Sequence, residues 1–389
     1  MSLLTEAKEF QEELIHIRRW FHAHPEVSHD LAETRGYVMK RLDELGIPYD
    51  YAENGGIIAR LGKRTGKSIL LRADMDALPI QEKTGLPFAS EHPGKMHACG
   101  HDVHMTMLLG AAKLLKQHEA DLKGEVILLF QEAEEVMGGA LNAINSGLLD
   151  PMPDRAFSMH VFPSETEPSG TFCFSSGVFM SSSDQWKVTV HGKSSHGSAP
   201  QNGINAITAA AQMIQGFANI ARYELDPQLP AVLTVCKIGG GDVNNIIPDT
   251  CSFEGTLRMV DEEKRAFMHT RMHQMVHSME EAYRVSADLQ IHGVPRVYND
   301  PEFVREVHDW IADLDGEIVQ DVGRKINMVS EDFSEFGLRI PSVMLEILSK
   351  SPEGKHFPGH NPCVIFDEEV LYRGSAAYAQ VAIKYLAGE

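Results

Sequence analysis

Length, composition and charge limit what this chain can be. At 389 residues it exceeds the size at which one hydrophobic core usually stops growing, so two domains are expected. A formal net charge of -20 repels phosphate backbones and anionic membrane surfaces, which argues against nucleic acid and membranes as partners. The five cysteines are too few and too scattered for a disulfide framework, and we find no signal segment or long apolar run, so we expect a cytoplasmic protein.

Strands and helices alternate along the first 180 residues, which is the pattern of an α/β layer. Apolar residues at helical spacing predict the helices, and short apolar runs bounded by turn residues predict the strands. Gly46 is expected to close the second helix at its C-cap. The predicted elements are helix 5–22, helix 32–45, strand 56–61, strand 68–73, helix 103–118, strand 123–131, a helix around Glu134, and strand 154–159.

From residue 181 the order becomes strand, helix, strand, strand, helix, strand, which matches a ferredoxin-like unit. We therefore expect an α/β catalytic domain, residues 1–180 and 297–389, with an inserted ferredoxin-like α+β domain at 181–296. The catalytic domain should end with strand 341–348 and helix 367–386. The elements predicted for the inserted domain are strand 185–192, helix 204–222, strand 231–238, strand 251–258, helix 261–283 and strand 286–294.

Segment 96–104 concentrates side chains that can bind a metal: a thiol, three imidazoles and a carboxylate. A second cluster, Glu132-Ala133-Glu134-Glu135, follows about thirty residues later. Thiolate, imidazole and carboxylate are the ligands of zinc-like ions, and an uncoordinated Glu beside such ions is a common general base. Either segment alone is weak evidence, because Cys-x-His pairs and adjacent glutamates also occur by chance.

The placement of these residues strengthens the metal hypothesis. Asp74 and Asp76 follow one predicted strand, Glu134 and Glu135 follow another, and His160 ends a third. Because sites in α/β sheets lie at the carboxyl ends of strands, these groups should meet at one edge. The residues therefore indicate a metal-dependent hydrolase.

Further motifs extend this pattern along the chain. They include His196 in a Gly- and Ser-rich segment, Asn245-Ile246-Ile247-Pro248-Asp249 followed by Arg258, and Gly359-His360. Together with segments 72–79 and 96–102 and the pair Glu134-Glu135, they cover nearly the whole chain. In this order and spacing the chain resembles the co-catalytic dizinc metallopeptidase family of aminoacylases and carboxypeptidases. Within that family it resembles the amidohydrolase branch, which includes hippurate hydrolases, auxin-conjugate hydrolases and bacterial N-acyl-amino-acid deacylases.

The resemblance implies a mixed-sheet catalytic domain that holds two divalent metal ions per subunit. Zinc is the first expectation for these ions, with manganese, cobalt or nickel as alternatives. The side chains that would ligate them are Cys99, His101, Glu135, His160 and His360.

The resemblance also implies roles in catalysis and substrate binding. Glu134 would be the general base for metal-activated water, and Asp76 would orient a ligating histidine. His196 would reach from the inserted domain to stabilise the oxyanion. Asn245 and Arg258 would hold the carboxylate of the substrate.

The implied activity is hydrolysis of the amide bond of N-acyl amino acids, such as N-acetyl or N-benzoyl conjugates. One alternative is a dipeptidase or aminopeptidase-like enzyme with the same catalytic groups and a different pocket. Another is a catalytically silent metal-binding protein. The partner would be a small N-acyl amino acid or short peptide, and the inserted domain would act as a lid and pair two subunits in a homodimer.

The chain departs from the family pattern around its paired glutamates. The usual Gln-Pro-Ala-Glu-Glu is here Gln131-Glu132-Ala133-Glu134-Glu135, and Val136-Met137 displace the glycines that commonly follow. Losing the proline removes a restraint on φ, and Glu132 adds a charge. We expect these changes to affect substrate preference rather than reaction type.

Several other polar residues near the motifs have simpler explanations than metal binding. Three neighbours of the expected ligands should form hydrogen bonds: His97, Asp102 and His104. Three histidines that precede the sheet should serve packing and capping: His22, His24 and His29.

Overall fold

The computed structural model describes residues 2–315, 319–321, 326–351 and 354–388. They fold into two compact units: unit 2 comprises Met180–Val297 and Ile326–Glu331, and the other described residues form unit 1. Each unit has its own hydrophobic core. Within the described ranges, no helix is long and apolar enough to cross a membrane.

The described part of unit 1 contains an eight-stranded sheet with the order β1-β2-β4-β3-β5-β16-β6-β15. The β3–β4, β3–β5 and β5–β16 pairs are parallel, whereas β1–β2, β2–β4 and β6–β16 are antiparallel. The predicted α/β class with a mixed sheet is therefore confirmed. The strands are β1 (Tyr49–Ala52), β2 (Gly56–Gly62), β3 (Ser68–Asp74), β4 (Glu125–Gln131), β5 (Arg155–Ser164), β6 (Thr171–Phe174), β15 (Val319–Asp321) and β16 (Ser342–Lys350).

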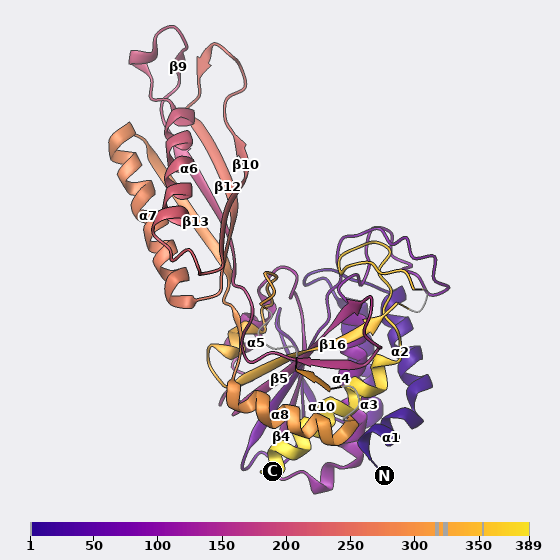
Figure 1. The fold of residues 1–389 in the computed structure, drawn as a ribbon. Helices are drawn as coiled ribbons and strands as arrows, with labels where there is room; N and C mark the ends of the chain where they lie inside the picture. The colour runs from indigo at the N-terminus through magenta and orange to yellow at the C-terminus, as the bar shows by residue number, and fades with distance from the viewer. Residues whose placement is uncertain (1, 316–318, 322–325, 352–353, 389) are drawn as a thin grey trace. The chain divides into compact units, whose positions relative to one another are not determined.

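Helices pack against this sheet, and α4 and α10 contact each other as well as β3 and β5 (Figure 1). Nearly every residue of α4 is buried, so the helix that follows Cys99 lies inside the unit 1 core. Gly46 closes α3 with a left-handed φ of 64°, as predicted. The helices of unit 1 are α1 (Leu3–Glu9), α2 (Gln11–Ala23), α3 (Ala32–Leu45), α4 (His101–Gln117), α5 (Gly139–Asn145), α8 (Pro301–Asp315), α9 (Ser334–Gly337) and α10 (Val370–Ala387).

Three sequence predictions for unit 1 are wrong in detail. The opening helix is two helices, α1 and α2, because Phe10 between them has φ -112° and ψ 22°. Glu134 lies in a turn and not in a helix, since Ala133 and Met137 have positive φ values of 56° and 60°. Strand β5 does not end at His160 but continues to Ser164, because it pairs along its length with β16. Strands β1, β6 and β15 were not predicted.

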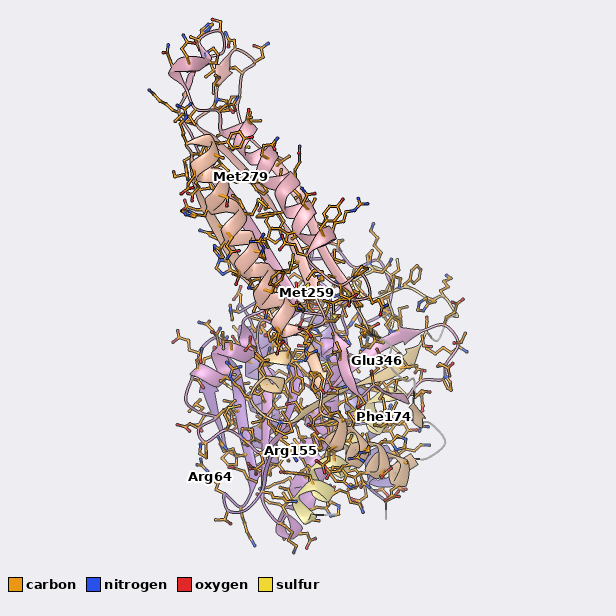
Figure 2. All side chains as sticks on the ribbon, turned by 60° about the vertical axis from the view of Figure 1, so that its left-hand side comes forward. Arg64, Arg155, Phe174, Met259, Met279 and Glu346 are labelled. Carbon is orange, nitrogen blue, oxygen red and sulfur yellow. The ribbon has the colours of Figure 1, made fainter. Side chains whose placement is uncertain are left out.

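Unit 2 contains a four-stranded antiparallel sheet with the order β10-β12-β8-β13. Helices α6 and α7 lie side by side on one face of it (Figure 1). In Figure 2, Met279 marks α7 and Met259 marks the end of β12. The elements are β8 (Ser183–His191), α6 (Ala206–Tyr223), β10 (Ala231–Gly239), β12 (Thr250–Met259), α7 (Glu262–Tyr283) and β13 (Ser286–Val294).

A small second sheet in unit 2 pairs β9 (Ser195–His196) with β11 (Ile246–Ile247). It lies beyond the ends of β10 and β12, at the tip of unit 2 (Figure 1). The chain leaves unit 1 through β7 (Gly177–Met180) and returns through β14 (Val297–Asn299). The role of unit 2 as a lid or a dimerisation domain stays a prediction.

Candidate metal centre

The loop that carries Cys99 and His101 reaches the sheet through Gly100. Gly100 is the N-cap residue of α4, with a φ of 91°. A Cβ atom at this position would lie 2.3 Å from Cγ1 of Val161 on β5. Because only glycine combines this backbone angle with so close an approach, Gly100 lets Cys99 and His101 come close to His160.

The hydrogen bonds of His101 determine which of its nitrogens can bind a metal. Its Nδ1 lies 2.6 Å from the backbone carbonyl oxygen of Asp76, which can only accept, so Nδ1 carries the proton. Its Nε2 is buried and has no hydrogen-bond partner among the residues that the structure describes. Burial lowers the pKa of His101 to about 4, so the ring is neutral. A neutral imidazole with an available Nε2 lone pair is the form that ligates metals.

Asp76 orients His101, as expected, and it also has a second role. Its backbone carbonyl, and not its carboxylate, orients His101. The carboxylate accepts the backbone N–H groups of Glu134 at 2.9 Å and Glu135 at 3.1 Å. Burial raises the pKa of Asp76 to about 8, and these two N–H groups oppose that rise. Asp76 thus connects the turn of the paired glutamates to the loop of the expected ligands.

His160 lies on β5 at the level where β3 and β4 end. Arg72 of β3 is paired with Ser158, so Asp74, the last residue of β3, lies level with His160. Glu346, labelled in Figure 2, is the partner of His160 on β16. Nδ1 of His160 donates to the carbonyl oxygen of Val161 at 2.8 Å, and its Nε2 lies 3.4 Å from Sγ of Cys99.

His360 joins these groups from a distant part of the sequence. Its backbone has a φ of 63°, and its N–H donates to the carbonyl oxygen of Ala98 at 2.9 Å. Its Nε2 lies 3.3 Å from Sγ of Cys99 and 3.5 Å from Oε1 of Glu135. A backbone hydrogen bond thus places His360 beside the loop that carries Cys99.

The donor atoms form two groups that share the sulfur of Cys99. One contains Cys99, His101 and His160, and the other contains Cys99, Glu135 and His360. Within each group the donor atoms lie within 4.8 Å of one another. Glu134 belongs to a further group with His101 and Glu135, so it lies beside the same atoms. A thiol, three imidazoles and a carboxylate fit zinc-like ions, and the buried Nε2 of His101 supports that fit.

His104 and Asp74 also lie near His101, but their bonding argues against a metal there. The N–H of Val161 donates to Nε2 of His104 at 2.8 Å, and Nδ1 of His104 donates to Asp74 at 2.6 Å. Both ring nitrogens are therefore used. Asp74 accepts a second bond from the buried Arg72 at 2.8 Å. His104 is a hydrogen-bonding neighbour, as expected from the sequence.

Asp102 and His22 stabilise the first turn of α4. Nδ1 of His22 lies 2.8 Å from the Asp102 carboxylate, and Nε of Arg18 lies 2.9 Å from the same oxygen. Burial opposes ionisation of Asp102, but Arg18 and His22 more than offset it and lower its pKa. His22 therefore bonds to this turn and does not cap a helix. The prediction that His97 forms hydrogen bonds is wrong, because within the described residues neither of its buried ring nitrogens has a hydrogen-bond partner.

Sequence reasoning assigned no role to Arg72, although it organises the edge of the sheet. The side chain is 1% exposed and donates to Asp74, Gln131 and Asp332. The sequence did contain one indication of this role, namely an arginine inside the apolar run of β3. A buried guanidinium requires acidic or amide partners. The sequence could not show which partners they would be.

The other three predicted site residues lie in unit 2. His196 is on β9, where its Nδ1 accepts the N–H of Ser198 at 3.1 Å. The carbonyl oxygen of Asn245 accepts the N–H of Gly197 at 2.7 Å, so His196 and Asn245 lie close together. Arg258 lies near the end of β12, and its buried Nη1 has no hydrogen-bond partner within the described chain.

Arg258 is far from His196 and Asn245 within unit 2. Thr250, at the start of β12, is paired with His191, the last residue of β8, which precedes β9. Arg258 is eight residues further along the same strand, or about 26 Å at 3.3 Å per residue. The three residues therefore occupy opposite ends of the sheet.

A mixed sheet with thiol, imidazole and carboxylate donors at one edge is typical of a metallohydrolase. The model of peptidase family M20/M25/M40 matches residues 70–384. The chain is 37% identical to the N-acetyl-L-cysteine deacetylase of Bacillus subtilis over 368 residues, which cover 94% of this chain and 86% of the relative. It is 33% identical to thermostable carboxypeptidase 1 of Saccharolobus solfataricus over 392 residues, covering 99% and 98% of the two chains.

A solved structure agrees with these sequence matches. The dinuclear metal-binding M20 peptidase of Bacillus subtilis has a TM-score of 0.81 and 32% identity, with 98% of this chain and 99% of that chain covered. The chain belongs to peptidase family M20/M25/M40. It is therefore a metal-dependent hydrolase of amide bonds.

Proposed function

We propose that the protein hydrolyses the amide bond of N-acyl amino acids and releases a carboxylic acid and a free amino acid. The observation that carries the proposal is that Glu134 lies beside a cluster of five donor side chains drawn from four parts of the sequence. The deacetylase relative supports an acylated amino acid as the substrate.

Two divalent ions would be held by two donor groups, one of Cys99, His101 and His160 and the other of Cys99, Glu135 and His360. Zinc suits this donor set best, and manganese, cobalt and nickel are the alternatives. When bound, such ions supply positive charge that activates water and polarises the amide carbonyl.

Glu134 would act as the general base. It is 8% exposed, and its backbone is held by Asp76. Its carboxylate would take the proton of the attacking water and deliver it to the departing nitrogen. Glu135, the next residue, would serve as a ligand because its Oε1 lies 3.5 Å from Nε2 of His360.

His196 would stabilise the oxyanion, and Asn245 and Arg258 would bind the substrate carboxylate. Burial lowers the pKa of Arg258, and a carboxylate would give its buried Nη1 a partner. One small substrate cannot contact both ends of the unit 2 sheet. This separation supports a homodimer in which one copy supplies Arg258 and the other supplies His196 and Asn245.

Replacing Glu134 with Gln tests the assigned base. The variant should keep the metal content of the wild type while turnover of N-acyl amino acids falls about a hundredfold or more, because the amide cannot accept the proton. Metal analysis and steady-state kinetics on N-acetyl and N-benzoyl amino acids would measure both. Unchanged turnover would reject Glu134 as the base.

A peptidase acting on unblocked dipeptides is the second candidate, and the carboxypeptidase relative favours it. The two substrate classes can be compared directly as kcat/KM on the wild-type protein. Higher values for unblocked dipeptides than for acylated amino acids would favour the peptidase. Failure of the metal-replete protein on both classes would favour a catalytically silent metal-binding protein.

A further inference from the structure

Glu132 is a buried carboxylate directly before the turn that carries Glu134 and Glu135. Its side chain is 0% exposed. It stands where the family that the chain resembles has proline, so the fixed φ of proline is lost at this position. A buried carboxylate needs partners of its own, and the structure shows which residues these are.

Three side chains from other elements surround Glu132. Nη1 of Arg35 on α3 donates to Oε1 at 2.9 Å, and the hydroxyl of Tyr51 on β1 donates to the same oxygen at 3.1 Å. The Arg35 guanidinium also lies over the Tyr51 ring, 5.1 Å from its centroid. Nδ1 of His29 lies 3.5 Å from Oε2. Glu132 therefore connects the end of β4 to α3 and β1.

The backbone after Glu132 needs such support. Ala133 and Met137, at φ 56° and 60°, both occupy the left-handed region that residues with a side chain avoid. Gly139 is packed so tightly that a Cβ atom would lie 1.6 Å from the carbonyl oxygen of Glu132. On the other side of the turn, Asp76 accepts the N–H groups of Glu134 and Glu135.

We propose that Glu132 is a positioning residue that, through Arg35 and Tyr51, holds the turn 133–137 against the metal centre. The inference rests on the proposed function, because the turn matters for catalysis only if Glu134 and Glu135 act as base and ligand. Glu132 belongs to none of the candidate donor groups, so it would act on catalysis only through the turn.

The test compares Glu132→Ala with a matched control at the other end of the same strand. Glu125 begins β4 and pairs with Arg60 at 2.9 Å, so Glu125→Ala also removes an ion pair from β4. Amide hydrogen exchange of Glu134 and Glu135 reports the turn directly and requires no substrate. In Glu132→Ala this exchange should be about tenfold faster, and in Glu125→Ala it should be unchanged.

Kinetics provide the second measurement. Glu132→Ala should lower kcat about tenfold and change KM less than twofold, because the base is displaced while substrate contacts remain. The double variant with Arg35→Ala should be no slower than Glu132→Ala alone, since both changes break one tether. If Glu132→Ala fails to fold, Glu132→Gln retains an acceptor for Arg35 and Tyr51 and should show smaller changes of the same kind.

The inference is overturned if the Glu132 variant matches the Glu125 control in amide exchange and in kcat. It is also overturned if the effects of Glu132→Ala and Arg35→Ala simply add. A wild-type protein that cleaves no acylated amino acid would contradict the proposed function instead. The exchange measurement would still decide whether Glu132 holds the turn.

Discussion

His101 and His104 lie one turn apart on α4 and are both buried, yet within the described residues only His101 of the two keeps a ring nitrogen without a hydrogen-bond partner. The difference comes from their neighbours. Nδ1–H of His101 donates to the carbonyl oxygen of Asp76, whereas Nε2 of His104 accepts the N–H of Val161. The sequence showed the concentration of imidazoles but not these bonds, because the partners Asp76 and Val161 come from other parts of the sequence.

The sharing of Cys99 gives a prediction about metal content. Cys99 belongs to both donor groups, whereas His360 belongs to one. His360→Ala should therefore lower the metal content from two ions toward about one per subunit, and Cys99→Ala should lower it below one. Elemental analysis after dialysis against a fixed free metal concentration would measure both.

His104→Ala is the matched control for these variants. It removes a buried imidazole close to the same centre, but one whose two nitrogens are already used. Its metal content should exceed that of Cys99→Ala. A Cys99 variant that keeps two ions would refute the shared sulfur.

At the scale of elements, hydrophobic periodicity predicted most of the fold. The strands and helices of unit 2 lie within a few residues of their expected positions, since each buries one face against the other layer. The turn after β4 could not be predicted, because the positive φ angles of Ala133 and Met137 depend on contacts with other elements. The same holds for β5, whose length follows from its pairing with β16.

One buried ion pair joins the two layers of unit 2. Asp184 on β8 is 0% exposed and accepts from Arg265 on α7 at 2.7 and 2.9 Å, with Nε2 of His269 at 3.2 Å. Burial opposes ionisation of Asp184, but His269 and Arg265 more than offset it and lower its pKa. Asp184→Asn should therefore destabilise unit 2 by about 3 kcal/mol at neutral pH, because Arg265 loses its charged partner.

The pH dependence of that loss follows from the lowered pKa. The carboxylate stabilises the folded state above its unfolded pKa of about 3.9, and this stabilisation is lost as pH falls through the lower folded value. The difference in stability between Asp184→Asn and the wild type should thus be full near neutral pH and shrink below about pH 4. Amide exchange in β8 and β12 would measure it, and a difference that does not vary with pH would contradict the assigned charge.

For the whole molecule, the two units divide the expected catalytic residues between them. The expected metal donors and Glu134 belong to unit 1, and His196, Asn245 and Arg258 belong to unit 2. Nothing in the sequence indicated that Arg258 lies at the opposite end of the unit 2 sheet from His196. That separation follows from the pairing of β12 with β8, and a short sequence motif does not reveal how two strands pair.

A complementation experiment tests the proposed division of the site between two copies. Glu134→Gln removes the base, and His196→Ala removes the oxyanion group, so each homodimer should have a few per cent of wild-type activity or less. A mixed dimer contains one chain of each variant. The site that has intact Glu134 receives intact His196 from the partner chain and is complete, whereas the other site lacks both groups. Co-expression with random pairing should then restore about one quarter of wild-type activity, and purified mixed dimers about one half. If the mixture is no more active than the separate variants, His196 does not act across subunits. The proposal that the active site requires a homodimer is then rejected.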